Sequence, residues 1–266
     1  MSGGVPSGSY IKIAKVDAYI AKPKSPNGSA IVICTDVFGY KFKNTQVIAD
    51  KFAEAGFLTI VPDQFAGKPL PEALMDRFLY LTTPRLSATP LQAYLLDPLG
   101  LVIFGIRTLF MVLPWFVANK PASKMPMFEQ LIGELRGGYC YGGATCIALG
   151  SGEDGMIDAF AVAHTQISVQ KDFESIKKPA LFVAADHDWA FPKKEFEAAE
   201  DIVKKKGIQD RVRLSFYPGT FHGFATRGSD DDPVVSEAKT KAFAESLLLF
   251  NSVLAQKPDV TPLVAA

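Results

Sequence analysis

Apolar and polar positions form alternating blocks along the chain, and each block predicts a strand or a helix. Short apolar runs typical of buried strands cover residues 11–21, 30–35, 57–61, 159–163 and 180–185, and an alternating run follows at 211–217. Apolar residues at helical spacing predict helices at 43–55, 142–149, 193–206 and 236–254. This alternation favours an α/β fold, with a mostly parallel, doubly wound sheet, helices on both faces and right-handed crossovers.

The segment 91–127 departs from the alternation. Residues 99–118 are almost all apolar, with Arg107 as the single charge, and a proline stands just outside each end. Its length alone would span a bilayer, but a span here would interrupt the sheet between two of its strands. We therefore expect one domain over residues 1–266 that carries 91–127 as an apolar lid or dimer contact, because an exposed apolar patch of this size is otherwise a liability. Docking of the lid on a membrane surface is a further alternative.

Charge and composition narrow the class of partner. The 28 basic and 28 acidic side chains cancel, which argues against binding to nucleic acid or to an anionic membrane. The chain has 266 residues, of which 48% are hydrophobic, enough to bury a large core. We find no cysteine and histidine spacing of a metal site and no glycine pattern of a dinucleotide or P-loop site, so we expect no cofactor. The expected partner is a small molecule, bound by a monomer or a homodimer.

Three cysteines, an odd number, favour thiols in a reducing compartment over a disulfide framework. Cys34 and Cys146 lie inside apolar runs, and we expect both to be small core residues. Residues 1–8 are small and polar and lack the layout of a secretory signal, so we expect a cytosolic protein. The run 27–29 matches a glycosylation sequon, but residues 26–28 are better interpreted as a hairpin turn.

The third cysteine, Cys140, stands in the run Gly-Tyr-Cys-Tyr-Gly-Gly at 138–143. Glycines two before and two after a nucleophile are what a sharp turn from strand to helix requires, because a Cβ there would clash with the neighbouring element. This pattern predicts a nucleophile elbow with cysteine in place of serine. The alternative is a glycine-rich turn that holds an inert buried cysteine.

An acid and a histidine follow in the order expected for such a nucleophile. Asp186 and Asp188 come at the end of the buried strand 180–185, and Asp188 fits the spacing to the following proline better. His222 comes on a loop after the alternating strand, which we expect to break at Pro218 and Gly219. Nucleophile, acid and then histidine is the chain order of α/β-hydrolases.

These residues resemble the dienelactone hydrolase family, and in particular its fungal-type members. The runs Ile31–Gly39, Val61–Phe65 and Phe160–Pro192 are similar to the family's core strands and to the loops that follow them. The resemblance implies an α/β-hydrolase fold and a cofactor-independent hydrolase that cleaves an ester or lactone.

The resemblance also implies roles for single residues. Cys140 would be the nucleophile, His222 the general base and Asp188 the residue that orients the histidine. The backbone N–H groups of Val37 and Tyr141 would bind the oxyanion. The positive end of the helix after the elbow and the nearby imidazole would both favour a thiolate at Cys140.

Further residues are candidates for binding or gating. Asp36 stands where the family has an acidic residue that gates the thiol, although a loop-capping aspartate is the alternative. Phe38 belongs to the same loop. His164 follows the strand 159–163 and either lines the pocket or is satisfied by loop backbone. Arg227 stands one position later than an arginine that clamps anionic substrates in bacterial members.

Two departures from the family pattern shape the expected function. The strand expected before the elbow covers residues 131–137, and Glu134 and Arg136 stand there where the family has an apolar run. No convincing second arginine accompanies Arg227, which favours a neutral, bulky lactone or ester as substrate. An isomerase or cyclase on the same scaffold and a non-catalytic ligand-binding protein are the alternatives.

Overall fold

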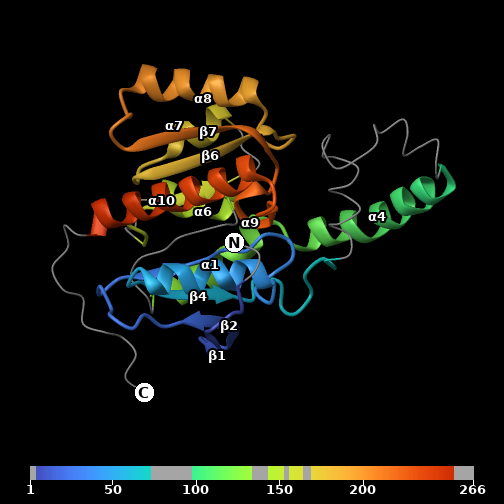
Figure 1. The fold of residues 1–266 in the computed structure, drawn as a ribbon, viewed down its shortest axis with the longest axis horizontal. Coiled ribbons are helices and arrows are strands. Elements are labelled where there is room, and N and C mark those ends of the chain that lie inside the picture. Colours follow the sequence, from blue (N-terminus) through green and yellow to red (C-terminus); the bar gives the residue numbers. More distant parts are fainter. Residues whose placement is uncertain (1–3, 73–97, 134–142, 153–155, 164–168, 255–266) are drawn as a thin grey trace.

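The computed structural model describes residues 4–72, 98–133, 143–152, 156–163 and 169–254. Its strands form two sheets (Figure 1). The first has the order β1-β2-β4-β3 and contains β1 (Ser9–Ile13), β2 (Val16–Ala21), β3 (Ala30–Val32) and β4 (Leu58–Pro62). The second has the order β5-β6-β7 and contains β5 (Phe160–Ala163), β6 (Ala180–His187) and β7 (Val212–Phe221). All pairs of the second sheet are parallel, as is β3 with β4, whereas β2 runs antiparallel to both β1 and β4.

Helices connect and cover these strands. They are α1 (Lys43–Glu54), α4 (Pro98–Ala118), the 3-10 helix η1 (Pro121–Lys124), α5 (Met125–Gly133), α6 (Gly143–Ser151), α7 (Val169–Ser175), α8 (Lys193–Lys206), α9 (Phe224–Arg227) and α10 (Pro233–Leu254). The predicted helices at 43–55, 142–149, 193–206 and 236–254 agree with α1, α6, α8 and α10 to within a few residues.

The core has two layers, one on each face of the strands. On one face α1 and α10 pack on residues such as Ala161 and Val183, and on the other α5, α6, α7 and α8 pack on their neighbours Val162 and Phe182. Side chains of one strand alternate between its faces, so each buried strand serves both layers. Residues of both sheets share each layer, and the doubly wound α/β architecture expected from the sequence is present.

Several local predictions were wrong. Residues 11–21 form a hairpin rather than one strand, because Ala14 and Lys15 adopt positive φ angles of 49° and 68° and reverse the chain. The turn at 26–28 does not make a hairpin, since the strands β2 and β3 on either side of it both pair with β4 and not with each other. The strand predicted at 30–35 ends at Val32.

Two further differences lie near the site. Strand β7 does not break at Pro218 and Gly219 but continues to Phe221, with a shift of its register against β6 between Ala185 and His187. Residues 131–133, which we assigned to the strand before the elbow, end the helix α5. The remainder of that predicted strand, with Glu134 and Arg136, lies outside the described residues. The same holds for Cys140, Tyr141, His164 and residues 91–97.

Helix α4 extends away from the layers (Figure 1, right). Its Val112 and Trp115 contact a small apolar cluster made by Phe38, Phe42 and Leu70. Trp115 also donates a hydrogen bond from Nε1 to the Lys68 carbonyl oxygen at 2.7 Å. Over the part of the chain that the structure describes, no helix meets the length and apolarity needed to cross a membrane.

Candidate active site

Strand β6 positions Asp188 at its carboxyl end. The side chain of Asp188 is completely buried. Its Oδ1 accepts hydrogen bonds from the backbone N–H groups of Ala190 at 2.8 Å and Phe191 at 3.3 Å. Two backbone donors fix the carboxylate and stabilise its negative charge, so the acid is held in one orientation.

Strand β7 brings His222 to this carboxylate. The His222 N–H bonds the His187 carbonyl oxygen at 3.1 Å, which ties the residue to the end of β6. The ring nitrogen Nδ1 lies 2.9 Å from Asp188 Oδ1. The imidazole side chain is 20% exposed. With Nδ1 directed to a buried acid, Nε2 is the nitrogen available to a nucleophile or a substrate.

Asp186, the competing acid, has a different partner. Its Oδ2 accepts a hydrogen bond from the Gly219 N–H at 2.9 Å. The structure thus brings Asp188, and not Asp186, to His222, as the spacing of the sequence favoured. Their catalytic roles remain a prediction.

The turn after His222 depends on a glycine. Gly223 has a φ of 91° and begins the short helix α9. A Cβ at this position would overlap the guanidinium of Arg227, one turn further along. The turn therefore sets Arg227 close to the histidine loop.

Arg227 binds Asp36, which lies on the loop after β3. The Arg227 Nη1 lies 2.8 Å from Asp36 Oδ2, and the two side chains are only 9% and 12% exposed. The guanidinium also lies over the ring of Phe38, 5.6 Å from its centroid. The contact joins the loops after β3 and β7, and it places Asp36, Phe38 and Arg227 in one cluster.

The loop after β3 is shaped by its own hydrogen bonds. Asp36 Oδ1 accepts from the Phe38 N–H at 3.1 Å, and the Asp36 carbonyl accepts from the Gly39 N–H at 3.1 Å. The Val37 carbonyl accepts from the Leu70 N–H at 2.8 Å. None of these bonds uses the Val37 N–H, the group that the sequence assigned to an oxyanion hole.

Two contacts of this cluster were not predicted from the sequence. Trp189 stacks on the imidazole of His222, with ring centroids 5.0 Å apart and an interplanar angle of 33°, and it is 60% exposed. Its position directly after the acid was the available signal. The pair of Asp36 and Arg227 joins residues that are 191 positions apart in the chain, and each was assigned a separate role from the sequence.

The cysteines differ in environment. Helix α6 begins at Gly143, three residues after Cys140. Cys146 lies within that helix and is completely buried, and burial raises the pKa of its thiol well above the ordinary value of 9.0. Cys34 is 1% exposed. Both are buried, as predicted, but Cys34 is disulfide-bonded, which corrects the expectation that the cysteines are thiols.

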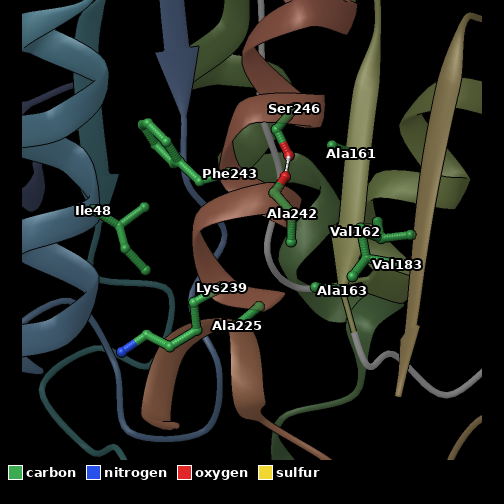
Figure 2. Close-up of a pocket in the computed structure, with 10 residues that line it drawn as sticks. All are labelled: Ile48, Ala161, Val162, Ala163, Val183, Ala225, Lys239, Ala242, Phe243 and Ser246. Carbon is green, nitrogen blue, oxygen red and sulfur yellow. Dashed lines mark hydrogen bonds between the residues drawn. The ribbon is translucent and has the colours of Figure 1, made fainter. Parts of the chain in front are cut away.

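An interior cavity lies away from these groups. It has a volume of about 20 Å³ and lies between α1, α10 and the strands β5 and β6 (Figure 2). The aliphatic part of Lys239 lines the cavity, whereas the Lys239 Nζ donates hydrogen bonds to the Gly228 carbonyl and to Asp230 outside it. Because its walls are mainly apolar and include neither Asp188 nor His222, it is a packing gap and not a substrate site.

A parallel sheet between helical layers, with an acid and a histidine paired at the ends of adjacent strands, defines an α/β-hydrolase. The profile of the dienelactone hydrolase family matches residues 16–89 and 132–254. The chain therefore belongs to the dienelactone hydrolase family and is an ester or lactone hydrolase that acts on a small molecule.

Individual proteins support this assignment. The chain is 26% identical over 265 residues to "Hydrolase tropI" of Talaromyces stipitatus, which covers 96% of this chain and 93% of that protein. It is 28% identical over 247 residues to "Dienlactone hydrolase 1" of Gibberella moniliformis, with 90% and 85% covered. The crystal structure of a putative dienelactone hydrolase from Klebsiella pneumoniae has a similar fold, with a TM-score of 0.62, 15% identity and coverage of 94% and 99%.

Proposed function

We propose that the protein hydrolyses an ester or lactone by covalent catalysis, with Cys140 as nucleophile, His222 as general base and acid, and Asp188 as the residue that orients His222. The observation that carries this proposal is the contact of His222 Nδ1 with the buried Asp188 Oδ1 at 2.9 Å. A buried carboxylate bound to Nδ1 selects the tautomer whose Nε2 accepts a proton.

The proposed reaction has two steps. The Cys140 sulfur attacks the carbonyl carbon, the thiol proton moves to His222 Nε2, and the C–O bond to the leaving alcohol breaks as His222 returns that proton. Water then attacks the thioester, with His222 as base, and releases the acid and the thiol. The N–H groups of Val37 and Tyr141 would bind the oxyanion in both steps, and each such donor typically lowers the barrier by about 3 kcal/mol.

The contact of Arg227 with Asp36 bears on the substrate. Because the guanidinium already binds a carboxylate in a nearly buried pair, it is not poised to bind an anionic substrate. Phe38 and Trp189 add aromatic surface close to the same loops. These contacts favour a neutral and bulky substrate over a small anionic lactone.

The proposed gating role of Asp36 requires that pair to open. Oδ2 of Asp36 bonds Arg227 and Oδ1 bonds the Phe38 N–H, so both oxygens are engaged within the described structure. A carboxylate that left Arg227 would expose a cation beside the site. Asp36 would then control both the thiol and the preference for charge.

The test is alkylation of the three cysteines by iodoacetamide at neutral pH, followed by peptide mass spectrometry, with ester hydrolysis measured on the same sample. We expect rapid alkylation of Cys140 alone, with loss of hydrolysis in proportion. Cys146 is the internal control, since burial and a raised pKa keep it neutral and inaccessible.

Other outcomes separate the alternatives. Product formation without uptake of water would support an isomerase or cyclase, and ligand binding that is unchanged in Cys140→Ala, without turnover, would support a binding protein. Alkylation of Cys140 that leaves hydrolysis intact would contradict the nucleophile. A thiolate nucleophile needs a reducing compartment, so the proposal places the protein in the cytosol.

A further inference from the structure

Helix α4 carries apolar side chains on the face that points away from the molecule. The large apolar residues that are at least half exposed on this helix are Ile106 (52%), Leu109 (58%), Phe110 (76%), Leu113 (57%), Phe116 (51%) and Val117 (61%). We call these six residues the α4 seam. They lie within one third of the helix circumference, at 100° per residue.

The opposite face of α4 is already occupied. Val112 and Trp115 pack on the cluster of Phe38, Phe42 and Leu70, and the ring of Trp115 lies 4.8 Å from that of Phe65. At about 100° per residue Trp115 lies roughly 160° from Leu113, on the opposite face, and Val112 lies at the border between the two faces. Within the described residues, the body of the molecule thus holds the Trp115 side of α4 and leaves the seam uncovered.

The spacing of the seam is that of a helix made to pair with another helix. Ile106, Leu109, Leu113 and Phe116 follow one another at intervals of three, four and three residues, and Phe110 and Val117 flank them. This is the a and d spacing of paired helices, in which each side chain inserts between residues of the facing helix.

The helix also needs packing for its own stability. It contains Gly105 and Pro114, and both residue types disfavour the interior of an isolated helix. Helices in water depend mainly on tertiary packing of one face, and the body supplies contacts along only part of α4.

We infer that the α4 seam is a homodimer interface, in which α4 of a second copy of this chain packs against it. Two copies related by a twofold axis present the same seam to each other. The six side chains are partly exposed, and each covers on the order of 100 Å² more on pairing, so two seams together bury roughly the 1,200 Å² of a small specific interface.

The chemistry of α4 argues against the other occupants. A helix that lies in a membrane surface has a polar face rich in lysine and arginine, whereas Arg107 is the only charged residue of α4. A lid that closes over the site would present its exposed apolar face to the site, but the face of α4 toward the loop of Phe38 is that of Val112 and Trp115.

The test is sedimentation velocity of the full chain between about 1 and about 100 µM, a range that brackets ordinary dimer affinities. We expect the wild type to dimerise and Leu113→Glu to weaken the dimer by at least about 30-fold, because a charge would be buried at the centre of the seam. Leu109→Gln, a milder change, should weaken it less, and circular dichroism would report whether each variant is folded.

Met111→Glu is the matched control. Met111 lies on the same helix and is 43% exposed, but it points away from the seam. Its variant should dimerise like the wild type. A wild type that stays monomeric at about 100 µM, or a dimer that survives Leu113→Glu, would overturn the inference. Binding of the monomer to phosphatidylcholine and phosphatidylserine vesicles, lost in Leu113→Glu, would do the same.

Discussion

Asp188 and His222 are held by different elements, and the contact between them depends on backbone hydrogen bonds at both ends. Asp188 is fixed by the N–H groups of Ala190 and Phe191, and His222 by its own N–H on the His187 carbonyl. Trp189 covers one face of the imidazole. These contacts keep the imidazole in one orientation, which the proposed proton transfer requires.

Asp188→Asn tests the role of the buried acid. We expect kcat/KM for a neutral activated ester to fall by about 10³-fold or more, because an amide at this position would stabilise the wrong tautomer of His222. Thermal stability should fall as well, because an NH2 group turned toward Nδ1 replaces the same Oδ1 that accepts from Ala190 and Phe191. Asp186→Asn, which removes the charge that Gly219 binds, is the control and should lose less than about tenfold. Equal losses in the two variants would contradict the assignment.

Opening the pair of Asp36 and Arg227 should change the preference for charge. In Asp36→Asn the guanidinium loses its buried carboxylate, so the ratio of kcat/KM for an anionic over a neutral ester should rise by about tenfold. A matched pair of esters, one with a terminal carboxylate and one with its methyl ester, measures this ratio. An unchanged ratio would show that Arg227 does not face the substrate.

At this scale the sequence predicted the pairing of Asp188 with His222 but not the other contacts around it. The spacing around Asp188 and the order of Cys140, Asp188 and His222 were visible, since they depend on residues close in the chain or on their order alone. The contact between Asp36 and Arg227 spans 191 positions and depends on how β3 and β7 come together, which no local pattern encodes. The stacking of Trp189 on His222 depends on the rotamer of His222, so it could not be predicted from the sequence either.

The elements that carry the site are held by close packing of small residues against large ones. In α6, the helix that follows the predicted elbow, Gly150 faces Phe160 of β5, and a Cβ on Gly150 would overlap the phenyl ring. Phe160 is completely buried. The helix can approach the strand this closely only because that side chain is absent.

Gly150→Ala should therefore destabilise the protein although alanine is the better helix former. We expect a loss of about 2 kcal/mol in the free energy of unfolding, measured with urea, because overpacking outweighs the gain in helix propensity. Gly152→Ala is the control. A Cβ there would meet only the Leu149 carbonyl oxygen at 3.5 Å, so its effect should stay within about 0.5 kcal/mol. A neutral Gly150→Ala would mean that α6 does not pack on β5 in this way.

Elements were predictable where one periodicity dominates, and less so at turns. Helices α1 and α8 follow from apolar spacing, and α8 ends at Gly207, whose φ is 64°. The chain reversal at Ala14 and Lys15 contains no glycine, asparagine or proline from which a turn could be predicted. Strand β7 continues through Pro218 and Gly219 because it lies at the edge of the described sheet, where a missing N–H is tolerated.

The whole molecule combines two sheets and two layers of helices with an arm that reaches outward. Residues of both sheets share each layer of the core. The alternation of strands and helices was enough to predict this architecture. The placement of α4 was not predictable, because an apolar run of this length fits a lid, a membrane-associated helix and an interface equally well.

Global stability should depend on pH through the buried thiol. The pKa of Cys146 is raised in the folded state by burial, so its contribution to stability is complete below the unfolded value of about 9 and is lost as the pH rises above it. Between pH 8 and pH 10, wild type should lose about 1 kcal/mol more of its free energy of unfolding than Cys146→Ala. Urea titrations of both proteins under reducing conditions measure the difference. Identical pH slopes would contradict the buried state of the thiol.

The most direct test of the proposed mechanism is the trapping of the covalent intermediate. The protein is mixed with a p-nitrophenyl ester, quenched with acid within the first turnover and digested for mass spectrometry, alongside His222→Ala and Cys140→Ala. We predict an acyl group on Cys140 in the wild type, slower acylation in His222→Ala and no acyl peptide in Cys140→Ala. Turnover by Cys140→Ala, or an acyl group on another residue of the wild type, would contradict the proposed nucleophile.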